Sequence, residues 1–165
     1  VDAIWFSDDW GSQEGLLISP KDWREVFKPR YRQLFNAARN MRMHTMLHSD
    51  GNILPIIDDL IESGLDVLEV EQPRLLGIKN LRERYGGRLC FMCPVDLQST
   101  LISGSKDEIV NEAKLLIESL GSLGGGFIAE EYLSWGDINI PEENMRTMYE
   151  AFKQFGSYQG LKIRQ

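Results

Sequence analysis

The sequence His44-Thr45-Met46-Leu47-His48-Ser49-Asp50-Gly51 is a short apolar run that ends abruptly in a polar cluster. Four other apolar runs end in the same way, each ahead of a helix-like segment, in the clusters Ser7-Asp8-Asp9-Trp10, Glu69-Val70-Glu71-Gln72, Pro94-Val95-Asp96 and Glu130-Glu131-Tyr132. Strands that lead into helices and carry carboxylates at their C-terminal ends are typical of the working face of a (β/α) barrel. The pattern therefore predicts both the architecture and the edge of the sheet where the chemistry takes place.

Helix start and stop signals separate five expected strands, at residues 3–6, 44–47, 66–70, 88–92 and 126–129. Ser19-Pro20-Lys21-Asp22 opens a helix that we expect to run to residue 40 with a bend at Pro29, and Ser105-Lys106-Asp107-Glu108 is a capping box. Further helices are expected over residues 53–63, 75–85, 105–120 and 141–155. Strands separated by such helices pair in parallel through right-handed crossovers.

These elements predict an α/β fold of the TIM-barrel type. A complete barrel of this kind has eight βα units, whereas the sequence supplies about five. The prediction is therefore a partial barrel with a parallel sheet, formed as a single domain over residues 1–165. Open strand edges recruit other chains, so we expect a homo-oligomer that covers the edges near residues 3–6 and 126–129.

The composition excludes several classes of partner. The net charge of −7 and the isoelectric point near 4.9 argue against binding to nucleic acid or to an anionic membrane. No apolar stretch approaches the roughly 20 residues that span a bilayer, and the N-terminal residues lack the basic region of a signal peptide. The two cysteines suggest a reducing compartment rather than a disulfide scaffold. We therefore expect a cytoplasmic protein that acts on a small-molecule substrate.

His48 and Asp50 are candidate metal ligands at the end of the second strand. Residues two apart on a strand point to the same side and lie about 6–7 Å apart along the chain. One nitrogen donor and one oxygen donor at that spacing could bind a divalent metal. The alternative is ordinary turn chemistry, because Asp50-Gly51-Asn52 is also a common turn sequence.

Glu69 and Glu71 share one side of the third strand. A carboxylate buried without a partner costs several kcal/mol, so each of them needs one. Glu71 lies nearer the C-terminal end of the strand, which makes it the better site candidate. For Glu69 we expect a basic partner such as Arg74.

Two pairs of adjacent acids offer further catalytic candidates. Neighbouring residues on a strand point to opposite faces, so at most one residue of each pair can face the site. The loop from Trp10 to Glu14 could form a lid or a platform over that site. The predicted catalytic residues are Asp8, Asp9, Glu130 and Glu131, and the predicted substrate-binding residues are Trp10, Gln13, Gln72, Asp96 and Tyr132.

Two other motifs are better explained by structure than by function. Cys90 and Cys93 have the spacing of a metal or redox pair, but an offset of three residues places them on opposite faces of a strand, and the sequence has no second pair. Gly124-Gly125-Gly126 precedes its strand, whereas a phosphate-binding loop follows a strand and opens a helix. We interpret this run as a tight turn after a helix.

The whole chain resembles the C-terminal part of the uroporphyrinogen decarboxylase (URO-D) superfamily. The stretches that carry the resemblance are Asp8-Asp9-Trp10-Gly11-Ser12-Gln13, Ser19-Pro20 with Trp23, His48-Ser49-Asp50-Gly51, Asp96-Leu97-Gln98, Gly125-Gly126-Phe127-Ile128 and Pro141-Glu142-Glu143-Asn144. The resemblance implies a TIM barrel with its site at the C-terminal ends of the strands. It also implies that this chain corresponds to the C-terminal βα units of that barrel.

The branches of this superfamily differ in their site residues. The corrinoid-linked and thiol-linked zinc methyltransferases carry His-x-Cys after a central strand and a later Cys, and this chain has His48, Asp50 and, near the later position, Ser134. Glu71 falls where the related cobalamin-independent methionine synthases carry a Glu. The C-terminal His of the porphyrinogen decarboxylases would fall near Ser134-Trp135.

Three functions follow from the resemblance. The first is metal-assisted methyl transfer from a corrinoid or methoxy compound, with zinc or another divalent metal on His48, Asp50 and Glu71, and with a corrinoid protein as partner. The second is a carboxy-lyase reaction, of the uroporphyrinogen decarboxylase type, on a tetrapyrrole or another polycarboxylate. The third is a partial barrel, or a fragment of a longer one, that has no catalytic activity of its own.

Overall fold

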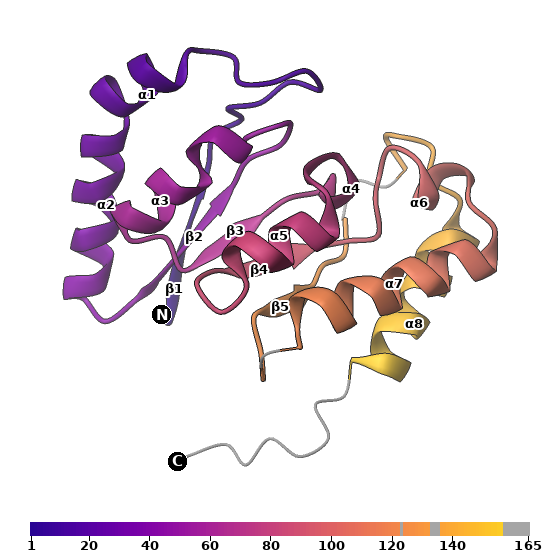
Figure 1. Ribbon diagram of the computed structural model, residues 1–165. Coiled ribbons are helices and arrows are strands. Elements are labelled where there is room, and N and C mark those ends of the chain that lie inside the picture. The colour runs from indigo at the N-terminus through magenta and orange to yellow at the C-terminus, as the bar shows by residue number, and fades with distance from the viewer. Residues whose placement is uncertain (123, 133–135, 157–165) are drawn as a thin grey trace.

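The computed structural model describes residues 1–122, 124–132 and 136–156. Five strands form one sheet in the order β1-β2-β3-β4-β5, and every pair of neighbours is parallel. The strands are β1 (Ala3–Ser7), β2 (His44–His48), β3 (Val67–Glu69), β4 (Cys90–Cys93) and β5 (Phe127–Ala129). Each connection passes through helices, as Figure 1 shows. The predicted α/β partial barrel is confirmed.

The helices follow the strands in the expected order. They are α1 (Pro20–Val26), α2 (Lys28–Asn40), α3 (Ile57–Ser63), α4 (Pro73–Leu76), α5 (Ile78–Tyr85), α6 (Thr100–Ser103), α7 (Lys106–Leu120) and α8 (Glu142–Phe155), with a 3-10 turn η1 (Leu54–Ile56) ahead of α3. The expected helix over residues 20–40 is divided at Phe27, where the expected bend was at Pro29. The expected helix over residues 75–85 begins earlier, at Pro73, and Gly77 divides it. The short α6 was not anticipated, because four residues carry too little periodicity to be recognised.

The helix signals in the sequence act as predicted. The Ser19 hydroxyl accepts a hydrogen bond from the backbone N–H of Asp22, and Ser105 and Glu108 form a complete capping box. In α7 the buried residues Ile109, Ala113, Leu116 and Leu120 recur every three or four positions, which places them on one face. That face packs between the sheet and α8, so the capping box sets the start of a helix on which the core depends.

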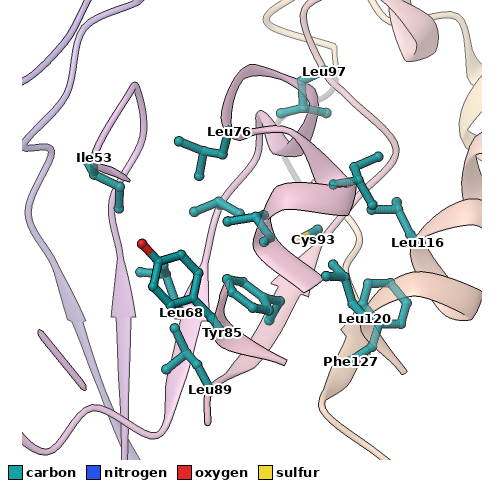
Figure 2. Packing of buried hydrophobic residues seen from close by; sticks show 14 of the residues in the cluster. Ile53, Leu68, Leu76, Tyr85, Leu89, Cys93, Leu97, Leu116, Leu120 and Phe127 are labelled. Atoms are coloured by element: carbon teal, nitrogen blue, oxygen red, sulfur yellow. The ribbon is translucent and has the colours of Figure 1, made fainter. Parts of the chain in front are cut away.

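The core lies between the sheet and the helical layer. Figure 2 shows strand residues such as Leu68 and Phe127 packed against Tyr85 of α5 and Leu116 of α7. Side chains that alternate with these point to the other side of the sheet, which we call the open face and define by Trp5, Met46, His48, Glu69 and Met92. The open face is less buried than the core, and Trp5 is 54% exposed. Among the described residues, no helix has both the length and the apolar character needed to cross a bilayer.

Two loops at the C-terminal edge of the sheet are joined through a pair of glycines. Gly51 has a φ of +80°, and a Cβ at this position would overlap the backbone of Gly11. A Cβ on Gly11 would in turn lie 2.6 Å from the backbone nitrogen of Asn52. The backbone N–H of Gly11 donates a hydrogen bond to the carbonyl of Asp50 at 3.1 Å. This contact holds the loop after β1 against the loop after β2, next to His48.

We predict that Gly51→Ala destabilises the protein by at least about 2 kcal/mol. The left-handed backbone is unfavourable for alanine and the added methyl group has no space. Urea unfolding measures the change, and Gly15→Ala is the matched control because a Cβ there meets nothing within 4 Å. The control should stay within about 0.5 kcal/mol of the unmodified protein. Equal stability of the two variants would contradict the close approach of the loops.

Candidate functional site

Strands β2 and β3 end side by side with charged residues. His48 is the last residue of β2 and pairs in register with Glu69, the last residue of β3. Glu71 follows two residues later and returns to the same side of the chain, because side chains alternate along an extended backbone. One ligand atom from each of His48, Glu69 and Glu71 lies within 4.8 Å of the others. These three residues are the centre of the candidate site, which belongs to the open face.

Glu69 is only 7% exposed and contacts His48 on the neighbouring β2 and Trp5 on β1, one strand further away. The indole N–H of Trp5 donates a hydrogen bond to Oε2 of Glu69. Oε1 of Glu69 lies 3.4 Å from Nδ1 of His48, which is the distance of an ion pair, although the geometry leaves Nδ1 without a hydrogen bond. Burial acts to raise the pKa of Glu69, but the contacts with His48 and Trp5 outweigh burial and lower it.

The expected pairing of Glu69 with Arg74 is wrong. Glu69 faces the open side of the sheet, whereas Arg74 belongs to α4 in the helical layer. Arg74 Nη1 donates to the Thr100 hydroxyl at 2.8 Å and to Glu112 at 3.1 Å. A hollow of about 840 Å³ surrounds this network. We do not assign the functional site to it, since its buried carboxylate is already paired with a guanidinium, a hydroxyl and the backbone N–H of Asp96.

Asp50 was predicted to be a metal ligand beside His48 and Glu71, but it is not one of the three residues that converge. Its carboxylate accepts hydrogen bonds from the backbone N–H of Glu71 at 3.1 Å and from the Gln72 amide at 3.2 Å. Glu69, rather than Asp50, has a ligand atom within the group that includes His48 and Glu71. Asp50 therefore connects two loops and orients Glu71. Gln13 joins the same network by donating to Gln72 at 2.6 Å.

One residue of the first acidic pair faces the site, whereas both residues of the second pair do. Asp9 Oδ1 lies 3.4 Å from Nε2 of His48, whereas Asp8 accepts a hydrogen bond from the Tyr31 hydroxyl at 2.6 Å. Glu130 is buried, at 7% exposure, and Glu131 is exposed at the rim. Both residues of this second pair line a pocket of about 560 Å³, together with Tyr132 and the central group.

Two predicted substrate-binding residues lie in the surrounding structure instead. The Trp10 ring packs edge-on against Trp23 and lies 4.4 Å from the Phe27 ring, and its indole N–H donates to Tyr31 at 2.8 Å. Asp96 Oδ1 accepts hydrogen bonds from the backbone N–H and the hydroxyl of Ser99, which fixes the turn before α6. Neither residue lines the 560 Å³ pocket.

The central group holds protons in the absence of a cation. The adjacent Glu69 carboxylate raises the pKa of His48 to about 9, more than burial lowers it. Burial, followed by the charge of Asp50, raises the pKa of Glu71 to about 7. Burial, followed by the charge of Glu69, raises the pKa of Glu130 to about 9. Carboxylates this close together favour any positive charge among them, whether a proton or a metal ion.

Sequence reasoning missed Trp5 and assigned Glu69 to another role. The signal for both was strand alternation, because residues 5, 46, 48 and 69 occupy one face once the strands are in register. The register was not visible in the sequence.

The cysteines behave as expected: both thiols are free, and Cys93 is fully buried and faces the helices. Ser134 and Trp135, where the resemblance would place a Cys or His, lie outside the described residues.

Comparisons with known proteins agree with this architecture. Residues 1–155 match the model of the family described as uroporphyrinogen decarboxylase (URO-D). A solved structure of a methyltransferase from Methanosarcina mazei superposes with a TM-score of 0.70 at 25% sequence identity. The alignment covers 94% of this chain and 43% of that protein, so this chain spans less than half its length. None of the curated proteins matches the sequence.

We predict that His48 remains protonated at neutral pH in the metal-free protein. In an NMR titration its ring protons should show a pKa near 9, and Glu69→Gln should bring that pKa down towards the ordinary histidine value of 6.5. The raised pKa contributes stability that is complete below pH 6.5 and is lost as the pH rises through about 9. Glu142→Gln, on the exposed surface of α8, is the control and should leave the titration unchanged. An unaltered His48 pKa in Glu69→Gln would contradict the assigned pairing.

Proposed function

This chain belongs to the uroporphyrinogen decarboxylase family, and from that premise we propose that it performs metal-assisted methyl transfer at the C-terminal edge of its sheet. The observation that carries the proposal is the convergence of His48, Glu69 and Glu71 within 4.8 Å. One imidazole and two carboxylates are a donor set that suits zinc or another divalent metal, with hard oxygen donors in the majority.

The residues of the pocket fit such a metal. Nδ1 of His48 and Oε2 of Glu130 are buried polar atoms without a hydrogen-bond partner among the described residues. Buried polar atoms without partners are rare in proteins and point to a missing ligand or ion. The fold neighbour from Methanosarcina mazei is described as a methyltransferase, which supports the reaction class for this chain.

In the proposed reaction, His48, Glu69 and Glu71 would hold the metal. As a Lewis acid the metal would lower the pKa of the acceptor nucleophile. The Trp5 indole would keep Glu69 in position, and Asp50 would do the same for Glu71 through its backbone N–H. Supporting contacts of this kind set the orientation of ligands in metal sites. The methyl donor would be a corrinoid, delivered by a partner protein, or a methoxy compound.

A carboxy-lyase acting on a polycarboxylate is the weaker alternative. Such a substrate needs cationic side chains, and Arg74 was the main candidate that the sequence offered at the C-terminal ends of the strands. Arg74 instead pairs with Glu112 in the helical layer. The described residues that line the 560 Å³ pocket include no Lys or Arg. The third reading, a partial barrel without activity of its own, is decided by the experiment below.

The metal proposal is tested by titration calorimetry with zinc. His48→Ala should lose more than the roughly 10–100-fold in affinity that the loss of a supporting residue costs. Zinc affinity should also rise with pH up to about 9, because the metal competes with the proton on His48. Cys93→Ala is the control, since burial raises the pKa of that thiol and keeps it protonated.

The reaction itself is tested with the zinc-loaded protein, methylcobalamin and a small thiol, followed by the loss of the methyl–cobalt absorbance. Turnover that disappears in His48→Ala and persists in Cys93→Ala would support methyl transfer. Equal zinc affinity in His48→Ala and the unmodified protein would show that the site is wrongly placed. Zinc binding without turnover on a methylated donor would favour a partial barrel that lacks activity by itself.

We also propose a homodimer or higher oligomer in a reducing, cytoplasmic setting. Strands β1 and β5 each have one neighbour in the described sheet, and the exposed residues Trp5 and Ile128 lie on them.

Light scattering at about micromolar concentration should give a mass of at least two chains. Ile128→Lys should shift the mass towards one chain, because a charge on an edge strand opposes pairing. Leu17→Lys, in an exposed loop, should not. A monodisperse monomer would contradict assembly through these edges.

A further inference from the structure

The pocket of the proposed site is strongly acidic. Glu69, Glu71, Glu130 and Glu131 line it beside His48, and no Lys or Arg is found among its described lining residues. A divalent metal on the central group would offset the charges of Glu69 and Glu71, and Glu131 would remain at the rim. The electrostatic field of the pocket therefore disfavours anionic ligands and favours cationic ones.

Trp5 provides an aromatic surface in the same pocket. Its ring is 54% exposed, and its centroid lies 6.2 Å from that of His48 at an interplanar angle of 45°. The hydrogen bond from its indole N–H to Glu69 fixes the orientation of the ring. An indole face is the best of the aromatic side chains at attracting a cation, and quaternary ammonium groups are recognised in this way.

Glu130, which also supports the metal proposal and whose carboxyl contacts Glu69, presents a second feature that points to a ligand in this pocket. The residue is 7% exposed, and its Oε2 atom has no hydrogen-bond partner among the described residues. Met46 and Met92 also line the pocket, and their thioethers are apolar, polarisable groups that pack well against methyl groups. A methylated cation is bound by acidic side chains, a fixed aromatic face and apolar groups, and the lining of this pocket supplies all three.

We propose that this pocket binds a methylated organic cation, a quaternary ammonium or a sulfonium, as the methyl-bearing substrate. The inference rests on the proposed function, and at the same site it puts a methylated cation in place of the corrinoid or methoxy compound as the methyl donor. In the transfer, the sulfur of an acceptor thiolate forms a bond to the methyl carbon while the bond from that carbon to the cationic nitrogen or sulfur breaks. The electron pair of the broken bond leaves on that atom, so the products are the methylated thiol (a thioether) and either a neutral amine or a second neutral thioether.

The charge of the ligand is tested by titration calorimetry with choline and with dimethylbutanol, its uncharged isostere in which carbon replaces the quaternary nitrogen. The zinc-loaded and metal-free forms of the whole chain are both titrated. Choline should bind about tenfold more tightly than dimethylbutanol, which is the range of a cation–π contact in a partly desolvated site. Citrate should not bind. Equal affinity for choline and the alcohol, or preferential binding of citrate, would overturn the proposal.

The role of the ring is tested with variants that fold as judged by circular dichroism. Trp5→Leu should weaken choline about tenfold, and Trp5→Phe, which keeps an aromatic face and loses the N–H, should weaken it less. Tyr149→Leu is the matched control, because Tyr149 is an aromatic residue of α8 that is 58% exposed outside this pocket. Unchanged choline affinity in both Trp5 variants would overturn the assignment.

The two proposals fail in different ways. If zinc binding depends on His48 but choline does not bind, the metal site stands and the cation proposal is wrong. If choline binds through Trp5 but no zinc binds to the unmodified protein, the metal proposal is wrong and the cation site stands. Both proposals are supported if Trp5→Leu weakens choline about tenfold and weakens zinc by no more than the roughly 10–100-fold that the loss of a supporting residue costs, less than the loss in His48→Ala.

Discussion

The pairing of His48 with Glu69 across β2 and β3 is the contact on which the site depends. The parallel register of the two strands brings the residues together at the same edge of the sheet. Glu69 is almost fully buried, so its charge is tolerated only because His48 and Trp5 contact it. Glu71 and Glu130 lie close to this pair, and burial together with the neighbouring carboxylates raises their pKa values. The carboxylates of this group repel one another, and a cation bound among them would reduce that repulsion.

The rest of the fold supplies the rigidity that such a cluster needs. The core between the sheet and the helical layer fixes the strands, and the contact between Gly11 and Gly51 fixes two loops that flank the site. Asp50 and Gln72 extend this support to the third loop. The polar side chains of these loops mainly accept hydrogen bonds from backbone N–H groups. Asp50 bonds the backbone of Glu71 in this way, so it orients Glu71 and does not itself join the central group. Repulsion among the carboxylates can persist because the core cannot easily relax around them.

The open face sets the chemistry apart from the stable part of the molecule. Its residues alternate with core residues along the same strands, so that each strand contributes both to packing and to the pocket. An acidic pocket without Lys or Arg among its described lining residues is poorly suited to a polycarboxylate.

Sequence patterns alone predicted the order of strands and helices, the helix caps and the edge of the sheet that carries the polar clusters. These features depend on local periodicity and on short-range hydrogen bonds, as in the capping box of Ser105 and Glu108. The prediction that at most one residue of each acidic pair faces the site holds for Asp8 and Asp9 but is wrong for Glu130 and Glu131, which both line the pocket. The folded structure was needed to show which partners meet: Glu69 joins His48 rather than Arg74, and Trp5 joins the pocket. Strand register and the separation of the two faces of the sheet depend on contacts between residues as far apart as Trp5 and Glu69, and no local pattern in the chain encodes such contacts.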